Sequence, residues 1–184
     1  RLPIRRLRCV KHAVPENKTR SMPDKSVALD KKVPAFACAA TGGKRWKLTD
    51  AAGKKLVIYF YPKDNTTGCT KEGEAFRDLY PAFKKAGTIV VGISPDSVES
   101  HEKFKAKMKF PFDLLADEER SVCALFDVWK EKSMYGRKYM GVERSTFLLD
   151  ERGVLRREWR KVKVPAHAEE VLAAMKVATR EISI

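Results

Sequence analysis

The stretch Leu56-Val-Ile-Tyr-Phe-Tyr-Pro-Lys-Asp-Asn-Thr-Thr-Gly-Cys69-Thr70 decides how the rest of the chain is organised. Its first six residues, Leu56 to Tyr61, are all apolar or aromatic, which is typical of a strand buried on both faces. Pro62 ends that strand, a polar loop follows, and Gly68-Cys69-Thr70 opens a helix. The N–H groups of a first helical turn and the helix dipole favour an ionised thiolate. The stretch therefore predicts a reactive cysteine just after a buried strand.

Four residues of this stretch stand at fixed spacing, Pro62-x-x-x-Thr66-x-x-Cys69 with Gly68 before the cysteine. The pattern resembles the active-site signature of the peroxiredoxins, and the wider frame YFYPKDNTTGCT resembles their bacterioferritin comigratory protein, or peroxiredoxin Q, branch. The resemblance covers roughly residues 32–176. It implies an α/β thioredoxin-like fold, with a central mixed sheet and helices on both faces. It also implies a thiol peroxidase that reduces hydrogen peroxide and organic hydroperoxides.

The implied reaction is attack of a thiolate on the O–O bond of a peroxide, which needs a nucleophile, positioning and charge stabilisation. Cys69 is the expected nucleophile. The hydroxyl of Thr66 can hydrogen-bond to the sulfur and to the peroxide, while Pro62 shields the pocket from water. The backbone N–H groups of Gly68 and Cys69 can donate to the peroxide oxygens. The family's arginine lies in a motif like R-x-T-F, so the resemblance assigns the stabilising cation to Arg144.

The chain departs from the family pattern where relatives carry a resolving cysteine. Glu74 stands five residues after Cys69, and Lys105 stands at the other common position, in the next helix. We therefore expect a one-cysteine cycle, in which an external thiol, either thioredoxin-like or of low molecular weight, reduces the sulfenic acid. The alternative is a Cys69–Cys123 disulfide, formed after local unwinding of the first helix. Cys123 lies among apolar residues, which predicts a buried thiol of low reactivity.

The charge of the chain is unevenly distributed. The whole chain carries a net +14, and residues 1–32 alone contribute +7, from ten Lys and Arg against three acids. We expect a mobile basic extension over residues 1–31 and a thioredoxin-like peroxidase domain over residues 32–180. The extension has no aromatic residue, which argues against specific nucleic-acid binding. A basic nucleic-acid or membrane-surface binding protein that acts through this arm stays as the alternative from another class.

The apolar runs and the cysteines bear on the compartment. No apolar run approaches the roughly 20 residues of a membrane span, and we find no secretory signal. The four cysteines show no close pairing and do not form the pattern of a disulfide framework, which favours a reducing compartment. They also show no C-x-x-C, which argues against a thioredoxin-like disulfide carrier. We expect a cytoplasmic protein, or one of an organelle matrix if the arm is a presequence. We also expect no cofactor, no metal, and a monomer or weak dimer.

Hydrophobic periodicity predicts the remaining elements. Strands are expected at residues 34–40, 45–48, 88–94, 110–115, 144–150 and 154–160, and helices at residues 70–86, 97–108, 121–126 and 166–180. Asp96 and Glu99 are spaced like a capping box for the second of these helices. His101 is expected on an exposed helical face, and His167 is expected to face solvent or to be incidental.

Overall fold

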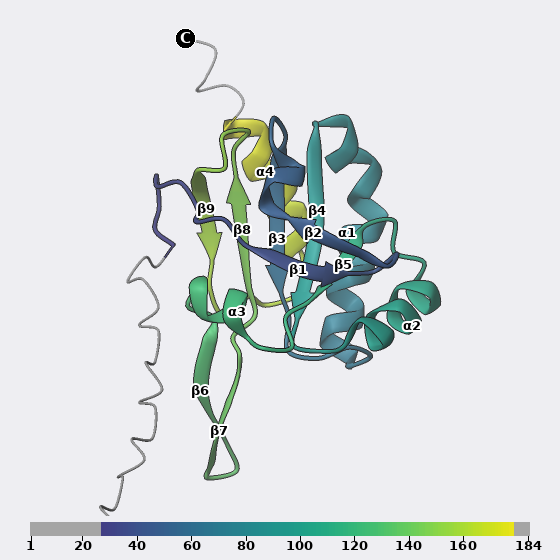
Figure 1. The fold of residues 1–184 in the computed structure, drawn as a ribbon, viewed down its shortest axis with the longest axis vertical. Helices are drawn as coiled ribbons and strands as arrows, with labels where there is room; N and C mark the ends of the chain where they lie inside the picture. The colour runs from purple at the N-terminus through teal and green to yellow at the C-terminus, as the bar shows by residue number, and fades with distance from the viewer. Residues whose placement is uncertain (1–26, 179–184) are drawn as a thin grey trace, which may run out of the picture.

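The structure, a computed structural model, describes residues 27–178. A seven-stranded mixed sheet forms its centre, and a separate two-stranded hairpin projects from it (Figure 1). The elements in chain order are β1 (Ala37–Ala40), β2 (Lys44–Lys47), η1 (Leu48–Ala51), β3 (Lys55–Phe60), α1 (Thr67–Lys85), β4 (Thr88–Ser94), α2 (Val98–Met108), β5 (Asp113–Ala116), α3 (Ser121–Leu125), β6 (Trp129–Met134), β7 (Arg137–Val142), β8 (Ser145–Leu149), β9 (Leu155–Trp159) and α4 (His167–Ala178).

β3 lies inside the sheet, whose strand order is β2-β1-β5-β4-β3-β8-β9. It pairs in parallel with β4 and antiparallel with β8, so both of its edges are hydrogen-bonded. All six of its residues are buried, as predicted. Because side chains alternate along a strand, even-numbered residues from Leu56 to Phe60 enter one core cluster. Odd-numbered residues from Val57 to Tyr61 enter the other.

The two faces of the sheet carry different elements. Residues of α1, α2 and α4 form the core cluster that contains Cys69. Residues of β1, β2 and α3 form the cluster on the opposite face, which contains Cys38 and Cys123. The predicted mixed sheet with helices on both faces is therefore confirmed. The same arrangement divides the three described cysteines between the two faces.

α1 follows the cysteine loop and is held by a close contact in its second turn. Thr66 is its N-cap, and Gly87, with a positive φ of 67°, follows its end. Pro81 lies inside the helix, as predicted. A Cβ added to Gly73 would come within 2.4 Å of Cζ of Phe110. The helix approaches that ring so closely because residue 73 has no side chain.

Two predicted boundaries are wrong. The strand predicted at residues 110–115 begins only at Asp113, because Pro111 lacks the N–H group that a sheet ladder needs. The capping box predicted from Asp96 is replaced by Ser97, whose hydroxyl accepts a hydrogen bond from the backbone N–H three residues later, at 3.3 Å. Serine at the N-cap is the simpler way to satisfy a first-turn donor.

The β6–β7 hairpin is an element for which the sequence analysis had no prediction. It pairs Trp129 with Val142 at its base and Met134 with Arg137 at its end. Its two-residue turn, Tyr135-Gly136, has positive φ at both residues, 51° and 75°. Such turns are usually signalled by Asn-Gly or Asp-Gly. A tyrosine in the first position conceals the hairpin in the sequence.

Most of the predicted basic extension, residues 1–26, lies outside the described residues. Its last residues contact the body of the protein. The N–H group of Asp30 donates to the carbonyl of Leu155 at 2.8 Å, and its carboxylate pairs with Arg156 at 2.9 Å. These contacts tie the segment that enters the domain to β9.

Replacing Gly73 by alanine tests the close contact between α1 and Phe110. Alanine in a helix interior is normally favoured over glycine by about 1 kcal/mol. Here we expect Gly73→Ala to lower the free energy of unfolding by about 1–3 kcal/mol, because the new methyl group overpacks the core. Urea unfolding measures the change, and Lys71→Ala on the exposed side of the same helix is the control. A more stable Gly73→Ala variant would show that the contact relaxes freely.

Candidate active site

The candidate site lies where β3 ends and α1 begins. The N–H group of Tyr61 donates to the carbonyl of Ile93 at 3.1 Å, which keeps the chain in the sheet up to Pro62. Asn65 adopts a positive φ of 57°, a conformation that asparagine tolerates better than most residues. Cys69 is the third residue of α1 and is only 2% exposed. The cysteine is therefore held in the first turn of the helix, as predicted.

Arg144 reaches this cysteine from the neighbouring strand. Ser145 opens β8 and pairs with Phe60 at the end of β3, so the residue before it lies beside the cysteine loop. Nη2 of Arg144 donates to Sγ of Cys69 at 3.3 Å. Gly68 allows this approach, because a Cβ at that position would lie 3.2 Å from Nη2. The structure brings together Cys69, Arg144 and Gly68, which the sequence analysis placed in one site.

Glu72, one helical turn after Cys69, is a site residue that the sequence analysis missed. Nη1 of Arg144 donates to its carboxylate, and the residue is 1% exposed. Burial raises the pKa of Glu72 to about 7, against the lowering effect of Arg144. Its second oxygen has no hydrogen-bond partner among residues 27–178. The i, i+3 spacing of this carboxylate from the cysteine was the signal that could have found it.

Tyr59 brings a second buried polar atom into the same surroundings. Its ring stacks on that of Phe76, with centroids 4.8 Å apart. Burial raises the pKa of Tyr59, and the charges of Glu72 and Cys69 raise it further. Within the described part of the chain its hydroxyl has no hydrogen-bond partner. The neutral phenol is therefore an unused hydrogen-bond donor in the electrostatic field of the site.

Thr66 and Pro62 lie in the loop that leads to Cys69. The hydroxyl of Thr66 donates to the carbonyl of Lys63 at 3.1 Å. The predicted hydrogen bond from this hydroxyl to the sulfur of Cys69 is therefore not formed. Thr66 is exposed and Pro62 is half-buried, so both are accessible to a ligand that arrives from solvent. The oxygen of Thr66 keeps lone pairs that can accept a hydrogen bond from such a ligand.

A buried polar network around Asp64 holds the loop between β3 and α1 in place. His101 belongs to this network, so the prediction that it is exposed is wrong. His101 is fully buried, with Nδ1 2.8 Å from Oδ2 of Asp64 and Nε2 3.1 Å from the carbonyl oxygen of Leu115. Asp64 also accepts hydrogen bonds from Tyr61 and Ser100, both at 2.7 Å. Burial raises the pKa of Asp64, but the interactions with His101, Ser100 and Tyr61 outweigh it and hold the pKa below its usual value. Ser100 and His101 of α2 therefore face the loop instead of water.

His167 is the second histidine whose predicted exposure is wrong. It is 4% exposed, and its Nε2 lies 2.8 Å from Oγ1 of Thr146. Burial lowers the pKa of His167, which favours the neutral ring at this position. Thr146 lies on β8, two residues after Arg144, so this contact holds the start of α4 against the strand that positions the arginine.

The other two described cysteines lie on the opposite face of the sheet from Cys69. Burial, helped by the charge of Asp117, raises the pKa of Cys38 to about 12 and raises that of Cys123 even further above the usual range. Both side chains are therefore neutral thiols, which are poor nucleophiles. The prediction that Cys123 is buried is confirmed.

Comparisons with known proteins agree with this geometry. A family model described as the AhpC/TSA family matches residues 29–158. Peroxiredoxin Bcp of Bacillus subtilis is 47% identical over 151 residues, 82% of this chain and 96% of the relative. Peroxiredoxin Bcp of Xanthomonas campestris is 52% identical over 141 residues, 77% of this chain and 88% of the relative. A solved structure of Xanthomonas campestris peroxiredoxin Q superposes with a TM-score of 0.74 at 51% identity, covering 77% of this chain and 90% of that one.

The raised pKa of Glu72 predicts a pH dependence of stability. In the unfolded chain Glu72 has a pKa of about 4.5, and in the folded protein its pKa is about 7. The stabilisation of the fold by neutral Glu72 is therefore fully present below pH 4.5 and is lost as the pH rises through about 7. We expect the free energy of unfolding of the wild type to fall by about 3 kcal/mol relative to Glu72→Gln across this window. Urea unfolding at several pH values measures the difference, with Glu74→Gln as the control carboxylate of the same helix. A difference that does not change with pH would contradict the buried carboxyl group.

The loop anchor gives a second prediction. We expect Asp64→Asn to lower the free energy of unfolding by about 3 kcal/mol, because the NH2 group of the amide replaces either the oxygen that accepts from Ser100 and His101 or the oxygen that accepts from Tyr61, and so sets a donor against a donor. Ser100→Ala removes one of those donors and is expected to lower the free energy of unfolding by about 1 kcal/mol. Urea unfolding at neutral pH compares them. Equal losses in the two variants would mean that Asp64 is not the centre of the network.

Proposed function

The chain belongs to the AhpC/TSA family, and on that premise we propose that Cys69 is the cysteine that attacks the peroxide. Like the relatives named peroxiredoxin Bcp, the chain is a thiol-dependent peroxidase. The observation that carries the assignment of Cys69 is the hydrogen bond from Arg144 to its sulfur at 3.3 Å. A cation in contact with the sulfur favours the thiolate, which is the nucleophilic form of cysteine.

The reaction conserves atoms and electrons without a cofactor. The thiolate of Cys69 attacks one peroxide oxygen, so that an S–O bond forms while the O–O bond breaks. The sulfur is oxidised to a sulfenic acid, and the departing oxygen takes up a proton and leaves as water or an alcohol. One external thiol then forms a mixed disulfide with Cys69 and releases water. A second thiol releases Cys69 as the reduced cysteine.

Each neighbour of the sulfur has a distinct role in this proposal. Arg144 polarises the O–O bond and stabilises the charge that develops on the departing oxygen. The N–H groups of Gly68 and Cys69 lie in the first turn of α1, where helix donors have no intrahelical partner and can donate to the peroxide. Thr66 accepts a hydrogen bond from the bound peroxide, and Pro62 limits the access of water to it.

The division of the cysteines between the two faces supports the one-cysteine cycle. Cys123 is fully buried on α3, in the core cluster on the opposite side of the sheet from Cys69. Unwinding of α1 would free Cys69 but would leave Cys123 of α3 buried in the core. The Cys69–Cys123 disulfide therefore needs a larger rearrangement than an external thiol does, and it is the second choice.

The substrates and reductant belong to the same proposal. One solved relative, the Xanthomonas campestris bacterioferritin comigratory protein, carries alkyl peroxide reduction activity in its title and is 50% identical, with a TM-score of 0.75. We assign hydrogen peroxide and organic hydroperoxides as substrates, and a thioredoxin-like or low-molecular-weight thiol as reductant. We further propose a cytoplasmic monomer or weak dimer. Within residues 27–178 no helix is long and apolar enough to span a membrane, and no group of three or more acidic, histidine or cysteine side chains could hold a metal ion.

Intact mass before and after a small molar excess of hydrogen peroxide tests the cycle. We expect the wild type and Cys123→Ser to gain one oxygen atom that a sulfenic-acid reagent traps, and Cys69→Ser to gain none. Loss of two hydrogen atoms in the wild type, but not in Cys123→Ser, would replace the one-cysteine cycle by the disulfide. An unchanged wild-type mass would overturn the assignment of Cys69.

The rate of peroxide reduction tests the role of Arg144. Removing this arginine alone would leave the buried Glu72 unpaired and destabilise the protein, so the comparison is made on a Glu72→Gln background. We expect Arg144→Met on that background to slow peroxide consumption by about 100-fold or more, because a preorganised cation is lost. Stopped-flow measurements compare it with Glu72→Gln alone, and thermal unfolding verifies that both are folded. Equal rates would remove Arg144 from the catalytic machinery.

A further inference from the structure

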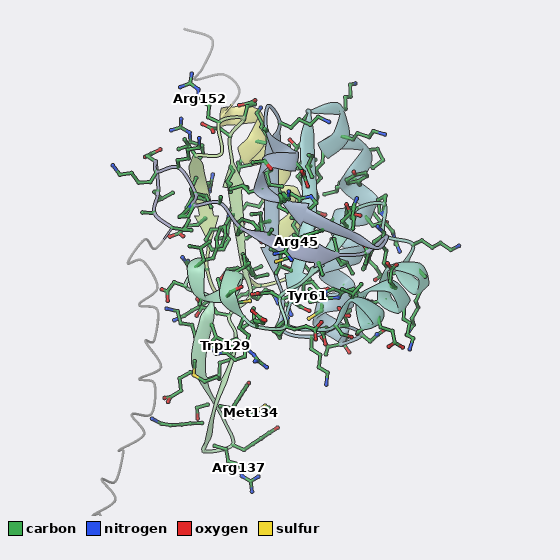
Figure 2. The ribbon with its side chains drawn as sticks, viewed as in Figure 1. Arg45, Tyr61, Trp129, Met134, Arg137 and Arg152 are labelled. Carbon is green, nitrogen blue, oxygen red and sulfur yellow. The ribbon has the colours of Figure 1, made fainter. Side chains whose placement is uncertain are left out.

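The β6–β7 hairpin, residues 129–142, carries an unusual surface. Five large hydrophobic side chains are exposed within residues 27–178, and four of them lie on this hairpin. They are Met134, Tyr135, Tyr139 and Met140, which are 56%, 98%, 44% and 49% exposed. Figure 2 shows Met134 and Arg137 at the free end of the hairpin and Trp129 at its base, against the body of the protein. The exposed apolar groups are therefore concentrated at the end farthest from the core.

The apolar side chains occupy both faces of the hairpin. Directly opposed residues of an antiparallel pair share a face, and the face alternates along each strand. Met134 opposes Arg137, and Lys132 opposes Tyr139. Because Lys132 stands two residues before Met134 on the same strand, both pairs lie on one face. Met140 lies on the other face, and Tyr135 lies in the turn between the strands. The hairpin therefore exposes apolar side chains on both of its faces and in its turn.

Cations surround these apolar groups. The hairpin contains four Lys and Arg against a single acid, Glu131. That acid is paired with Lys138 at 3.0 Å, and Lys138 and Arg137 lie on opposite faces. Aromatic and apolar side chains with cations beside them are the usual composition of a segment that rests in the headgroup layer of a membrane.

We propose that the end of this hairpin, Met134 to Met140, inserts into the headgroup layer of an anionic lipid bilayer. A medium that surrounds the hairpin covers both of its apolar faces at once. A protein surface or a second copy of this chain would cover one face and leave the other in water. The cations fit the negative potential of an anionic membrane, which attracts each nearby Lys or Arg.

The base of the hairpin borders the site of Cys69. β7 ends at Val142, two residues before Arg144. Lys132 of β6 donates to the carbonyl of Val142. Burial lowers the pKa of Lys132, and the nearby charge of Arg144 lowers it further, while that of Cys69 raises it. A consequence, which rests on the proposed function, is that docking would hold the reactive cysteine close to the hydroperoxides of unsaturated lipids.

Vesicle co-sedimentation of the full chain, without peroxide, tests the docking independently of catalysis. The probes are vesicles of phosphatidylcholine alone and of phosphatidylcholine with phosphatidylglycerol. We expect binding to the mixed vesicles only, weakened about tenfold by Tyr135→Ser and about fivefold by Arg137→Gln. Leu29→Ser is the matched control and is expected to bind like the wild type, because among residues 27–178 Leu29 is the one exposed large hydrophobic residue outside the hairpin. Wild-type binding by Tyr135→Ser would overturn the proposal and assign the interaction to another part of the chain.

A depth measurement locates the contact. Tyr135→Trp introduces a fluorophore at the turn, and vesicles whose acyl chains are brominated close to the headgroups quench an indole at the boundary between headgroups and acyl chains. We expect this variant to show quenching in excess of that of the wild type, whose native tryptophans supply the background. Vesicle binding without that excess would contradict insertion of the turn. Self-association that Tyr135→Ser abolishes, in a protein that does not bind vesicles, would replace the bilayer by a second copy of the chain.

Discussion

The guanidinium group of Arg144 is the interaction on which the site depends. One nitrogen donates to the sulfur of Cys69, and another donates to the buried carboxylate of Glu72. The two acceptors lie one helical turn apart, so a single cation holds both groups on the same face of α1. Without this cation a carboxylate and a potential thiolate would share a dry site with no compensating charge. In the candidate site, one arginine therefore compensates the negative charge of two acidic groups.

The fold supplies this cation by strand pairing. Antiparallel pairing of β8 with β3 sets the residue before Ser145 beside the end of β3, and the absence of a side chain at Gly68 leaves space for the guanidinium. The carboxylate of Asp64 fixes the loop between β3 and α1, because it accepts hydrogen bonds from Tyr61 just after β3 and from two side chains of α2, Ser100 and His101. The sulfur is thus positioned by the rigid strand, the helix and the anchored loop together. Such preorganisation is what stabilisation of developing charge requires.

The sequence predicted the parts of the structure that depend on local pattern. The run from Leu56 to Tyr61 has the composition of a buried strand, and the helix after Cys69 has a clear apolar stripe, so both elements were found. Arg144 lies 75 residues after the cysteine, and only the family resemblance connected the two. His101 and His167 were misassigned, because a histidine on a helix looks exposed unless its distant buried partner is known.

The remaining omissions have similar causes. Glu72 stands among charged residues in the sequence, and only the packing of α1 against β3 makes its position buried. The β6–β7 hairpin exposes apolar residues on both faces and turns at Tyr135-Gly136. It therefore lacks the one-sided alternation and the Asn-Gly turn by which hairpins are recognised. Its exposed surface becomes visible only once the strands are paired.

Peptide-level mapping of a sulfenic-acid trap tests the central claim most directly. The wild-type protein is treated with less peroxide than protein, trapped, digested and sequenced by mass spectrometry. If the cation of Arg144 makes Cys69 the reactive sulfur, the adduct will lie on the peptide that contains Cys69, and the peptides of Cys38 and Cys123 will carry none. An adduct found mainly at Cys9, Cys38 or Cys123, or divided evenly among the four cysteines, would contradict the account.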